Sequence, residues 1–378
     1  MISKAKTGKN CAESLHAHSH NFSHKHYSEI TIIDLRHAIG QLFITGFRGT
    51  TAAEESRIAR DISLSNLGGV ILFDRFLSGP SAEGNVISKE QLQYLCRELQ
   101  SVSKTPLFIA VDQEGGAVQR LREKHGFAPI PSAEEMGRDN SFAESAVQAH
   151  TTGKVLAETG INCNFAPVAD LSIEPNNPII GKIGRSFGSD AAAVSRHCEV
   201  WLDGLRQFGI LGCLKHFPGH GSSIKDSHKG FVDISATWQQ HELLPYHRLV
   251  QKKKVEAIMM GHLYHSGLDP LHPASLSRSI IQGMLRTTMH YNGLIITDDM
   301  QMHAITQRYG ILEAVVLAIE AGVDLVILGN NLDYDETLLQ KAIDAVEEAV
   351  QDGRLSAETI FAAFKRISAA KKAWSEAG

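Results

Sequence analysis

Short apolar runs alternate along the chain with longer segments of helical composition. Eight of these runs have the length of buried strands. They cover residues 42–47, 69–73, 107–111, 161–166, 210–214, 257–260, 294–297 and 325–328. Helices are predicted between and after them, at residues 53–64, 89–102, 143–159, 192–208, 240–250, 280–289, 312–321, 334–350 and 356–374.

This alternation predicts the α/β fold class. Strands separated by helices pair in parallel with right-handed crossovers, and eight repeats favour closure into a single (β/α)8 TIM-type barrel. The alternative is an open doubly wound sheet, but no phosphate-binding glycine fingerprint follows the first strand. Because little of the 378-residue chain is left over, we expect one catalytic domain at residues 29–378.

Polar side chains follow seven of the eight predicted strands, where a barrel of this type opens into its pocket. They are Asp74, Arg75, Asp112, Glu114, Asp170, Lys215, His216, His262, Asp298, Asp299, Asn330 and Asn331. Serine or glycine would serve equally well in strand-to-helix turns, so this convergence of charge indicates a site for a polar substrate.

The segment 215–230, KHFPGHGSSIKDSHKG, carries three histidines and three lysines directly after the fifth strand. Asp226 stands two residues before His228, from where a carboxylate can orient an imidazole and raise its basicity. The spacing therefore indicates a proton-transferring histidine on an active-site loop. A solvated polar loop with incidental histidines is the alternative interpretation of this short motif.

Together with the DQEGG sequence at 112–116, GRSFG at 184–188 and TDDM at 297–300, this loop resembles the β-N-acetylglucosaminidases of glycoside hydrolase family 3. The motifs occur in the order typical of that family and span most of the chain. The resemblance implies a retaining exo-acting enzyme that removes GlcNAc. It also implies a substrate class, GlcNAc linked to anhydro-N-acetylmuramic acid in muropeptides during bacterial cell-wall recycling.

The resemblance also implies roles for individual residues. Asp298 would be the nucleophile that forms a covalent glycosyl-enzyme intermediate, and His228, assisted by Asp226, would be the acid/base. Contacts with the sugar or with the pocket walls are implied for Asp112, Arg120, Arg185, Lys215 and His216.

Structural roles remain open for several of these residues. An aspartate of the TDDM motif could cap the following helix, with Asp299 the better candidate. The basic residues of the site could be paired structurally with Asp112, Asp170 or Asp324. His220 and His262 are weaker candidates, and His220 could simply shape its loop.

The sequence departs from the family pattern at two positions. Ala117 stands where arginine is frequent, and Ser222 stands where an acidic residue is frequent. Both positions concern the detail of the subsites, and neither belongs to the proposed chemistry.

Other activities on the same scaffold are a β-glucosidase or an N-acetylglucosaminide phosphorylase, because the sequence does not distinguish water from phosphate as the attacking group. A barrel that binds carbohydrate without catalysis is the non-enzymatic alternative. We expect no metal and no organic cofactor, since no compact ligand motif such as HExxH is present.

Composition and charge indicate which class of partner the protein binds and in which cellular compartment it works. The formal net charge of -5 disfavours a nucleic-acid partner and favours a small-molecule substrate. Five scattered cysteines fit reduced thiols better than a disulfide framework. No secretory signal and no membrane-spanning apolar stretch is evident, so a cytoplasmic enzyme, with a monomer favoured, is expected.

The first 28 residues are polar and rich in histidine. Alternating histidines can bind Zn²⁺ or Ni²⁺, but the segment lacks apolar periodicity. We therefore expect a disordered tail rather than a metal site.

Overall fold

The computed structural model describes residues 35–78, 83–138, 140–227 and 229–377. Two predictions concern residues outside these ranges, namely the histidine-rich tail at 1–28 and the acid/base His228. Both stay predictions.

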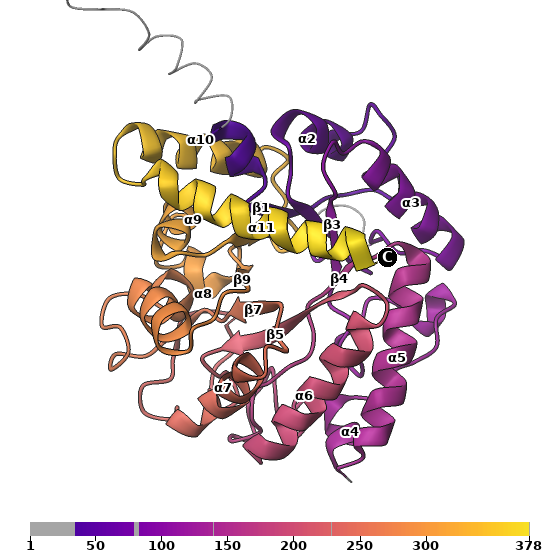
Figure 1. Ribbon diagram of the computed structural model, residues 1–378, viewed down its shortest axis with the longest axis vertical. Helices are drawn as coiled ribbons and strands as arrows, with labels where there is room; N and C mark the ends of the chain where they lie inside the picture. The colour runs from indigo at the N-terminus through magenta and orange to yellow at the C-terminus, as the bar shows by residue number, and fades with distance from the viewer. Residues whose placement is uncertain (1–34, 79–82, 139, 228, 378) are drawn as a thin grey trace, which may run out of the picture.

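Eight parallel strands form a closed barrel with helices around it (Figure 1). The strands are β1 (Phe43–Gly46), β2 (Gly69–Ile71), β3 (Phe108–Val111), β4 (Cys163–Asn164), β5 (Leu211–Phe217), β7 (Ala257–Met260), β9 (Leu294–Asp299) and β10 (Leu325–Leu328). Their order around the barrel is β1-β10-β9-β7-β5-β4-β3-β2. Each predicted apolar run overlaps one of these strands, so the TIM-type barrel is confirmed. Strands β5 and β9 extend beyond their predicted ends at 214 and 297, to Phe217 and Asp299.

A small parallel sheet of β6 (Val232–Asp233) and β8 (Leu263–Tyr264) lies outside the barrel. It joins the segment after β5 to the segment after β7. The sequence did not predict it, because two-residue strands carry no periodic signal.

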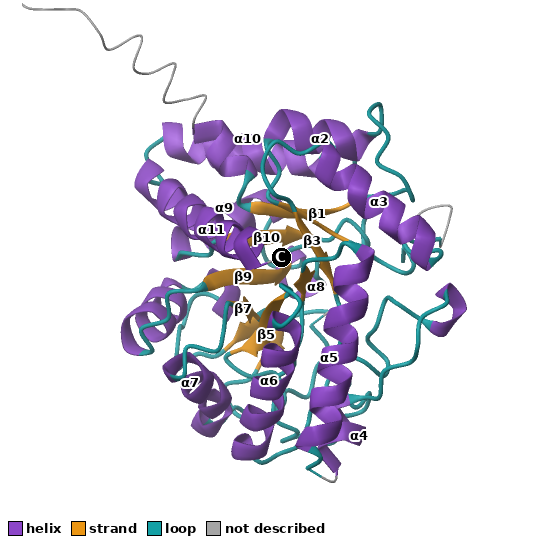
Figure 2. Cartoon of the chain, turned by 45° about the vertical axis from the view of Figure 1, so that its right-hand side comes forward, coloured by secondary structure: helices purple, strands orange, loops and turns teal. Residues whose placement is uncertain are grey.

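The helices that surround the barrel are mostly those predicted (Figure 2). They are α2 (Arg57–Ser65), α3 (Lys89–Ser101), α5 (Phe142–Thr159), α6 (Ala191–Arg206), α7 (Leu244–Gln251), α9 (Ile311–Ala321), α10 (Leu338–Gln351) and α11 (Ala357–Ala377). Shorter helical segments are α4 (Ala133–Arg138), α8 (His303–Thr306), η1 (Glu123–His125) and η3 (Ala274–Leu276).

Several helix boundaries differ from the prediction for local reasons. Helix α2 begins only at Arg57, because the Ser56 side chain accepts a hydrogen bond from the Ala59 amide and caps the helix. Helix α10 begins at Leu338, since the Asp335 amide donates to Asn330 Oδ1 at 2.9 Å and belongs to the loop after β10.

Two predicted helices have a different internal geometry. The segment predicted at 240–250 divides into a 3-10 turn, η2 (Gln240–Leu243), and α7, which has a proline in its first turn. The segment η4 (Ser279–Thr288) is π-helical along its length. Composition alone does not distinguish these forms from an α-helix.

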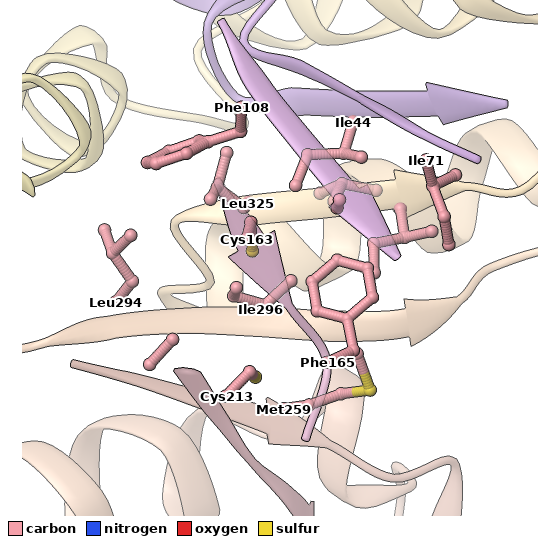
Figure 3. Packing of buried hydrophobic residues seen from close by; sticks show 14 of the residues in the cluster. Ile44, Ile71, Phe108, Cys163, Phe165, Cys213, Met259, Leu294, Ile296 and Leu325 are labelled. Atoms are coloured by element: carbon pink, nitrogen blue, oxygen red, sulfur yellow. The ribbon is translucent and has the colours of Figure 1, made fainter. Parts of the chain in front are cut away.

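Apolar side chains from the strands fill the barrel interior (Figure 3). Ile44, Phe108, Ile296 and Leu325 are among the buried side chains that pack there. The four described cysteines are all free and buried, in agreement with the expectation of reduced thiols.

Helix α11 covers the amino ends of the first strands, and it crosses in front of them in Figure 1. The Lys371 ammonium on this helix donates to Gln41 Oε1 at 2.7 Å and to the Gly68 carbonyl at 2.8 Å. Gln41 and Gly68 lie just before β1 and β2. The amino end of the barrel is therefore covered here, and the polar strand ends open at the opposite end.

None of the described helices combines the length and the apolar composition needed to cross a membrane.

Candidate active site

The carboxyl ends of the strands open onto a cavity of about 370 Å³. Six of the predicted site residues line it: Asp112, Arg120, Arg185, Lys215, His216 and Asp298. An adjoining cavity of about 130 Å³ is bounded by Asp112, Arg120 and Asp298 as well, and by Phe165 and Met259. The barrel thus brings residues from positions 112 to 298 into one pocket.

Asp112 directly follows β3 and lies between two cations. Its Oδ1 accepts a hydrogen bond from Lys215 Nζ at 2.8 Å, and its Oδ2 accepts one from Arg120 Nη2 at 3.1 Å. Burial alone would raise the pKa of Asp112, but the charges of Lys215 and Arg120 hold that pKa well below its usual range. Asp112 is therefore an ionised carboxylate of fixed orientation, suited to accept hydrogen bonds from sugar hydroxyls.

Glu114 connects Arg185 to Lys215, the lysine that also pairs with Asp112. Arg185 binds it through two parallel hydrogen bonds, Nε to Oε2 and Nη2 to Oε1, both 2.8 Å long. Lys215 Nζ lies 2.6 Å from the same Oε1. The sequence had placed Glu114 at a strand end without assigning it a role, and its partnership with Arg185 was missed because the two residues lie 71 positions apart.

Asp170 fixes the ring of His216 in the pocket. Its Oδ2 lies 2.6 Å from His216 Nδ1, and its Oδ1 accepts the backbone amides of His216 at 3.2 Å and His220 at 2.7 Å. With Nδ1 held in this way, Nε2 of His216 lies 3.4 Å from Arg185 Nη2, at the cavity wall. Asp170 is a positioning residue. The sequence had placed it at a strand end and as a possible ion-pair partner, without identifying His216 as the residue it holds.

His220 has a structural role within the loop. Burial lowers its pKa to about 4, with the nearby His216 adding to this effect, so its imidazole is neutral at pH 7. Its Nδ1 lies 2.8 Å from Ser223 Oγ and its Nε2 lies 3.2 Å from Ser227 Oγ. His220 thereby ties the first half of the loop to the residue between Asp226 and His228.

The two aspartates that end β9 have different environments. Asp299 Oδ1 accepts hydrogen bonds from the backbone amides of Gln301 at 3.0 Å and Gly329 at 2.9 Å. Asp298 lines both cavities, and its Oδ1 accepts the Asp299 amide at 2.8 Å. Asp299 is thus engaged by the backbone, whereas the Asp298 carboxylate faces the space that a substrate would fill.

Asp226, one member of the proposed acid/base dyad, is adjacent in the chain to a residue that lines this space. Asp226 has a largely buried side chain, with Lys229 Nζ at 3.8 Å from its Oδ2. Its neighbour Ser227 lines the same cavity as Asp298. His228 lies outside the described ranges, so its pairing with Asp226 stays a prediction.

His262 is held by Ser275, with Nδ1 and Oγ 2.8 Å apart, and by the Asp299 carbonyl, 2.9 Å from its Nε2. Both ring nitrogens thus contact the framework, and the ring steadies the end of β9. Within residues 35–377, gaps excepted, no three histidine, cysteine or acidic side chains gather in a metal-binding group.

Comparison with known proteins gives the family of the chain. Residues 34–370 match the family described as the glycosyl hydrolase family 3 N terminal domain. The chain is 35% identical over 274 residues to the β-hexosaminidase LpqI of Mycobacterium tuberculosis, covering 70% of this chain and 68% of that protein. It is 33% identical over 316 residues to a β-hexosaminidase of Idiomarina loihiensis, covering 82% of this chain and 89% of that protein.

Solved structures show the same relationship. A family 3 β-N-acetylglucosaminidase from Paenibacillus sp. str. FPU-7 superposes with a TM-score of 0.82 at 33% identity, over 90% of this chain and 62% of that chain. A β-N-acetylhexosaminidase from Beutenbergia cavernae gives a TM-score of 0.79 at 30% identity, over 89% and 98% of the two chains. The present chain therefore spans less than two thirds of the Paenibacillus enzyme but nearly all of the Beutenbergia enzyme.

Proposed function

Since the chain belongs to glycosyl hydrolase family 3, we propose that it is a retaining exo-β-N-acetylglucosaminidase that releases terminal β-linked GlcNAc. Relatives named β-hexosaminidase and β-N-acetylglucosaminidase support this activity. The observation that carries the proposal is the placement of Asp298 on the cavity that Asp112, Lys215 and His216 also line. Asp299, the other aspartate at the end of β9, does not line this cavity and is bound by the Gly329 amide.

The reaction that this arrangement supports has two steps. Asp298 attacks the anomeric carbon while His228 donates a proton to the departing glycosidic oxygen, which leaves GlcNAc as an ester on Asp298. His228 then takes a proton from water, and the water oxygen displaces Asp298 from the anomeric carbon. Two inversions give net retention, and no metal or organic cofactor is needed.

Neighbouring charges support the individual roles. Asp112 is kept ionised by Lys215 and Arg120, so it can hold hydroxyls of the sugar ring in one orientation. Arg185 and His216 line the same wall, each fixed by a buried carboxylate. Such preorganised groups lose little side-chain entropy when a substrate binds.

The natural substrate follows from the family resemblance. We propose that the GlcNAc is released from muropeptides, with anhydro-N-acetylmuramic acid as the next sugar, by a cytoplasmic and monomeric enzyme. A cavity of about 370 Å³ with a packed barrel beneath it supports an exo mode, because it suits the end of a glycan.

A product analysis tests this proposal. The purified full-length chain is given GlcNAc-anhydro-N-acetylmuramic acid, 4-nitrophenyl β-N-acetylglucosaminide and the corresponding glucoside, each with and without phosphate. Free β-GlcNAc as the first product, independent of phosphate, is expected. GlcNAc 1-phosphate as the product would establish a phosphorylase, and faster cleavage of the glucoside would establish a β-glucosidase.

Substitution of Asp298 tests the mechanism. Asp298→Ala is expected to lower kcat by several orders of magnitude at unchanged thermal stability, because a nucleophile in a pocket is removed. The exposed Asp352 gives the matched control, Asp352→Ala, with wild-type turnover expected. His228→Ala should impair the nitrophenyl substrate less than the disaccharide, since nitrophenolate needs little protonation. Near-wild-type activity of Asp298→Ala would contradict the mechanism.

A further inference from the structure

The short helix α8 directly follows the end of β9, the strand that carries the proposed nucleophile Asp298. The Met302 amide donates a hydrogen bond to the Asp299 carbonyl at 3.0 Å, which joins the start of the helix to the end of the strand. Met302 also lines the smaller cavity beside Asp298, and Ile305 is buried in the hydrophobic core. Helix α8 is therefore fixed in place relative to the nucleophile.

The active-site loop is bound to this helix on both sides of the proposed acid/base, His228. The Ala304 amide donates a hydrogen bond to the Ser227 carbonyl at 3.1 Å. The side chain of Gln307, the residue after the helix, donates from Nε2 to the Lys229 carbonyl at 3.3 Å. The two residues that flank His228 in the chain are thus both held by the segment that follows β9.

The two hydrogen bonds differ in what the sequence must supply. Any residue except proline could donate the backbone hydrogen bond at position 304. The bond to Lys229 needs a side chain of suitable length with an N–H group, which Gln307 provides. Gly230 leaves room for this side chain, since a Cβ on Gly230 would lie only 3.0 Å from Gln307 Oε1. The contact therefore depends on the particular residues at 307 and 230.

The chain that follows this contact is anchored separately. Phe231 packs against Tyr264, with ring centroids 5.2 Å apart, and the Arg308 guanidinium lies 5.0 Å from the centroid of the Phe231 ring. The small β6–β8 sheet begins one residue later. Gln307 thus binds the stretch of the loop between the part that His220 ties down and the part that the sheet ties down.

Acid/base catalysis is sensitive to the placement of the proton donor. A general acid acts only within hydrogen-bond reach of the departing oxygen, and a displacement of about 1 Å can cost about 100-fold in rate. In the proposed mechanism the nucleophile belongs to β9 and the acid/base to a different loop. The distance between them therefore depends on the contacts that join these two segments.

We propose that Gln307 is a positioning residue for acid/base catalysis, which holds the loop in place relative to Asp298 through its hydrogen bond to the Lys229 carbonyl. This role rests on the proposed function and adds to it a residue remote from the reacting atoms, since Gln307 lines neither of the two cavities. Loss of the hydrogen bond should therefore impair proton transfer, while substrate binding and attack by Asp298 are kept.

Two glycosides of GlcNAc separate proton transfer from the other steps. GlcNAc-β-1,4-GlcNAc has a sugar hydroxyl as its leaving group, which must be protonated as it departs. The leaving group of 2,4-dinitrophenyl β-N-acetylglucosaminide departs as a stable anion and needs no proton. The ratio of kcat/KM for the disaccharide to kcat/KM for the dinitrophenyl substrate therefore measures the contribution of the general acid.

Three variants are compared with the wild type. Gln307→Met keeps the length of the side chain and removes its donor, and it should lower the ratio about tenfold, a part of the 100-fold to 10,000-fold that a general acid typically contributes. Gln307→Lys keeps a donor at similar reach and should restore part of the ratio. Gln93→Met is the matched control, because Gln93 Nε2 also donates to a backbone carbonyl at an exposed position, that of Glu158 at 2.8 Å, but joins α3 to α5. Its ratio should equal that of the wild type.

The outcomes distinguish the role of Gln307 from the proposed function. An unchanged ratio in Gln307→Met would refute the positioning role and leave the proposed function intact. An equal loss on both substrates would also refute it, because a general structural effect would then explain the result. If the wild type cleaves neither substrate, the proposed function fails and the role of Gln307 fails with it.

Discussion

Glu242 provides a quantitative test of how the active-site loop is supported. Its carboxyl group is buried beneath the loop, 1% exposed. One oxygen accepts the Gln239 amide at 3.0 Å, closing a capping box at the start of η2. The other oxygen faces the loop, 2.9 Å from where a Cβ on Gly219 would lie.

Burial raises the pKa of Glu242 to about 7 from an ordinary value of 4.5, and the hydrogen bond from the Gln239 amide offsets this only in part. The unfolded chain therefore releases this proton at lower pH than the folded chain does. The contribution of Glu242 to the free energy of unfolding falls as pH rises from 4.5 to 7 and levels off above that. The full difference is about 3 kcal/mol, at about 1.4 kcal/mol for each tenfold change in the protonation equilibrium.

Glu242→Gln removes the titrating group while keeping its size. At pH 8 the variant is expected to unfold with a free energy up to about 3 kcal/mol above that of the wild type, and this advantage should vanish near pH 4. Urea unfolding followed by tryptophan fluorescence across this range measures the difference, provided that the m-values of the two proteins agree.

The difference between the two proteins is informative because every other titrating group is common to both. Glu54→Gln, at an exposed position, serves as the control and should match the wild type at every pH. A free-energy difference between Glu242→Gln and the wild type that does not vary with pH would refute the reasoning. A stability advantage of Glu242→Gln that is larger at pH 4 than at pH 8 would show that the pKa of Glu242 is shifted in the opposite direction.

Two further predictions concern stability. Burial lowers the pKa of Lys371 to about 7, so the wild type loses stability as the pH falls and the folded chain must take up this proton. The free energy of unfolding of Lys371→Met, relative to that of the wild type, should therefore be about 4 kcal/mol greater at pH 6 than at pH 10. Denaturant unfolding measures this difference, and a difference that does not change with pH would contradict the prediction. Gly221→Ala would place its Cβ 1.6 Å from the Leu171 carbonyl oxygen and should cost at least about 2 kcal/mol. Gly283→Ala, which meets no atom within 4 Å, should change stability by no more than about 1 kcal/mol, and equal effects of the two variants would exclude the steric explanation.

The barrel could be predicted because its strands are buried on both faces. Segments such as β7 and β10 are therefore continuous apolar runs, which are visible without knowledge of their partners. The extra β6 and β8 strands and the π-helical η4 were not predictable in this way. They depend on hydrogen bonds that leave no periodic pattern in composition.

The candidate site was predictable in part for a similar reason. Asp112 and Asp298 follow apolar runs directly, so the barrel prediction already placed them at one rim. Their environments were not predictable. The choice between Asp298 and Asp299 depends on the Gly329 amide, which β10 brings to the end of β9 and which binds Asp299.

The sequence by itself determined the repeating strand and helix units, the residues at the strand ends and the resemblance to a family of glycosidases, because these depend on neighbours along the chain. Only the tertiary structure decided which charges neutralise one another. Lys215 meets Asp112 across 103 positions and Arg185 meets Glu114 across 71, and such pairs form only when the barrel closes. The electrostatics of a site depend on distances in space, which the order of residues does not contain.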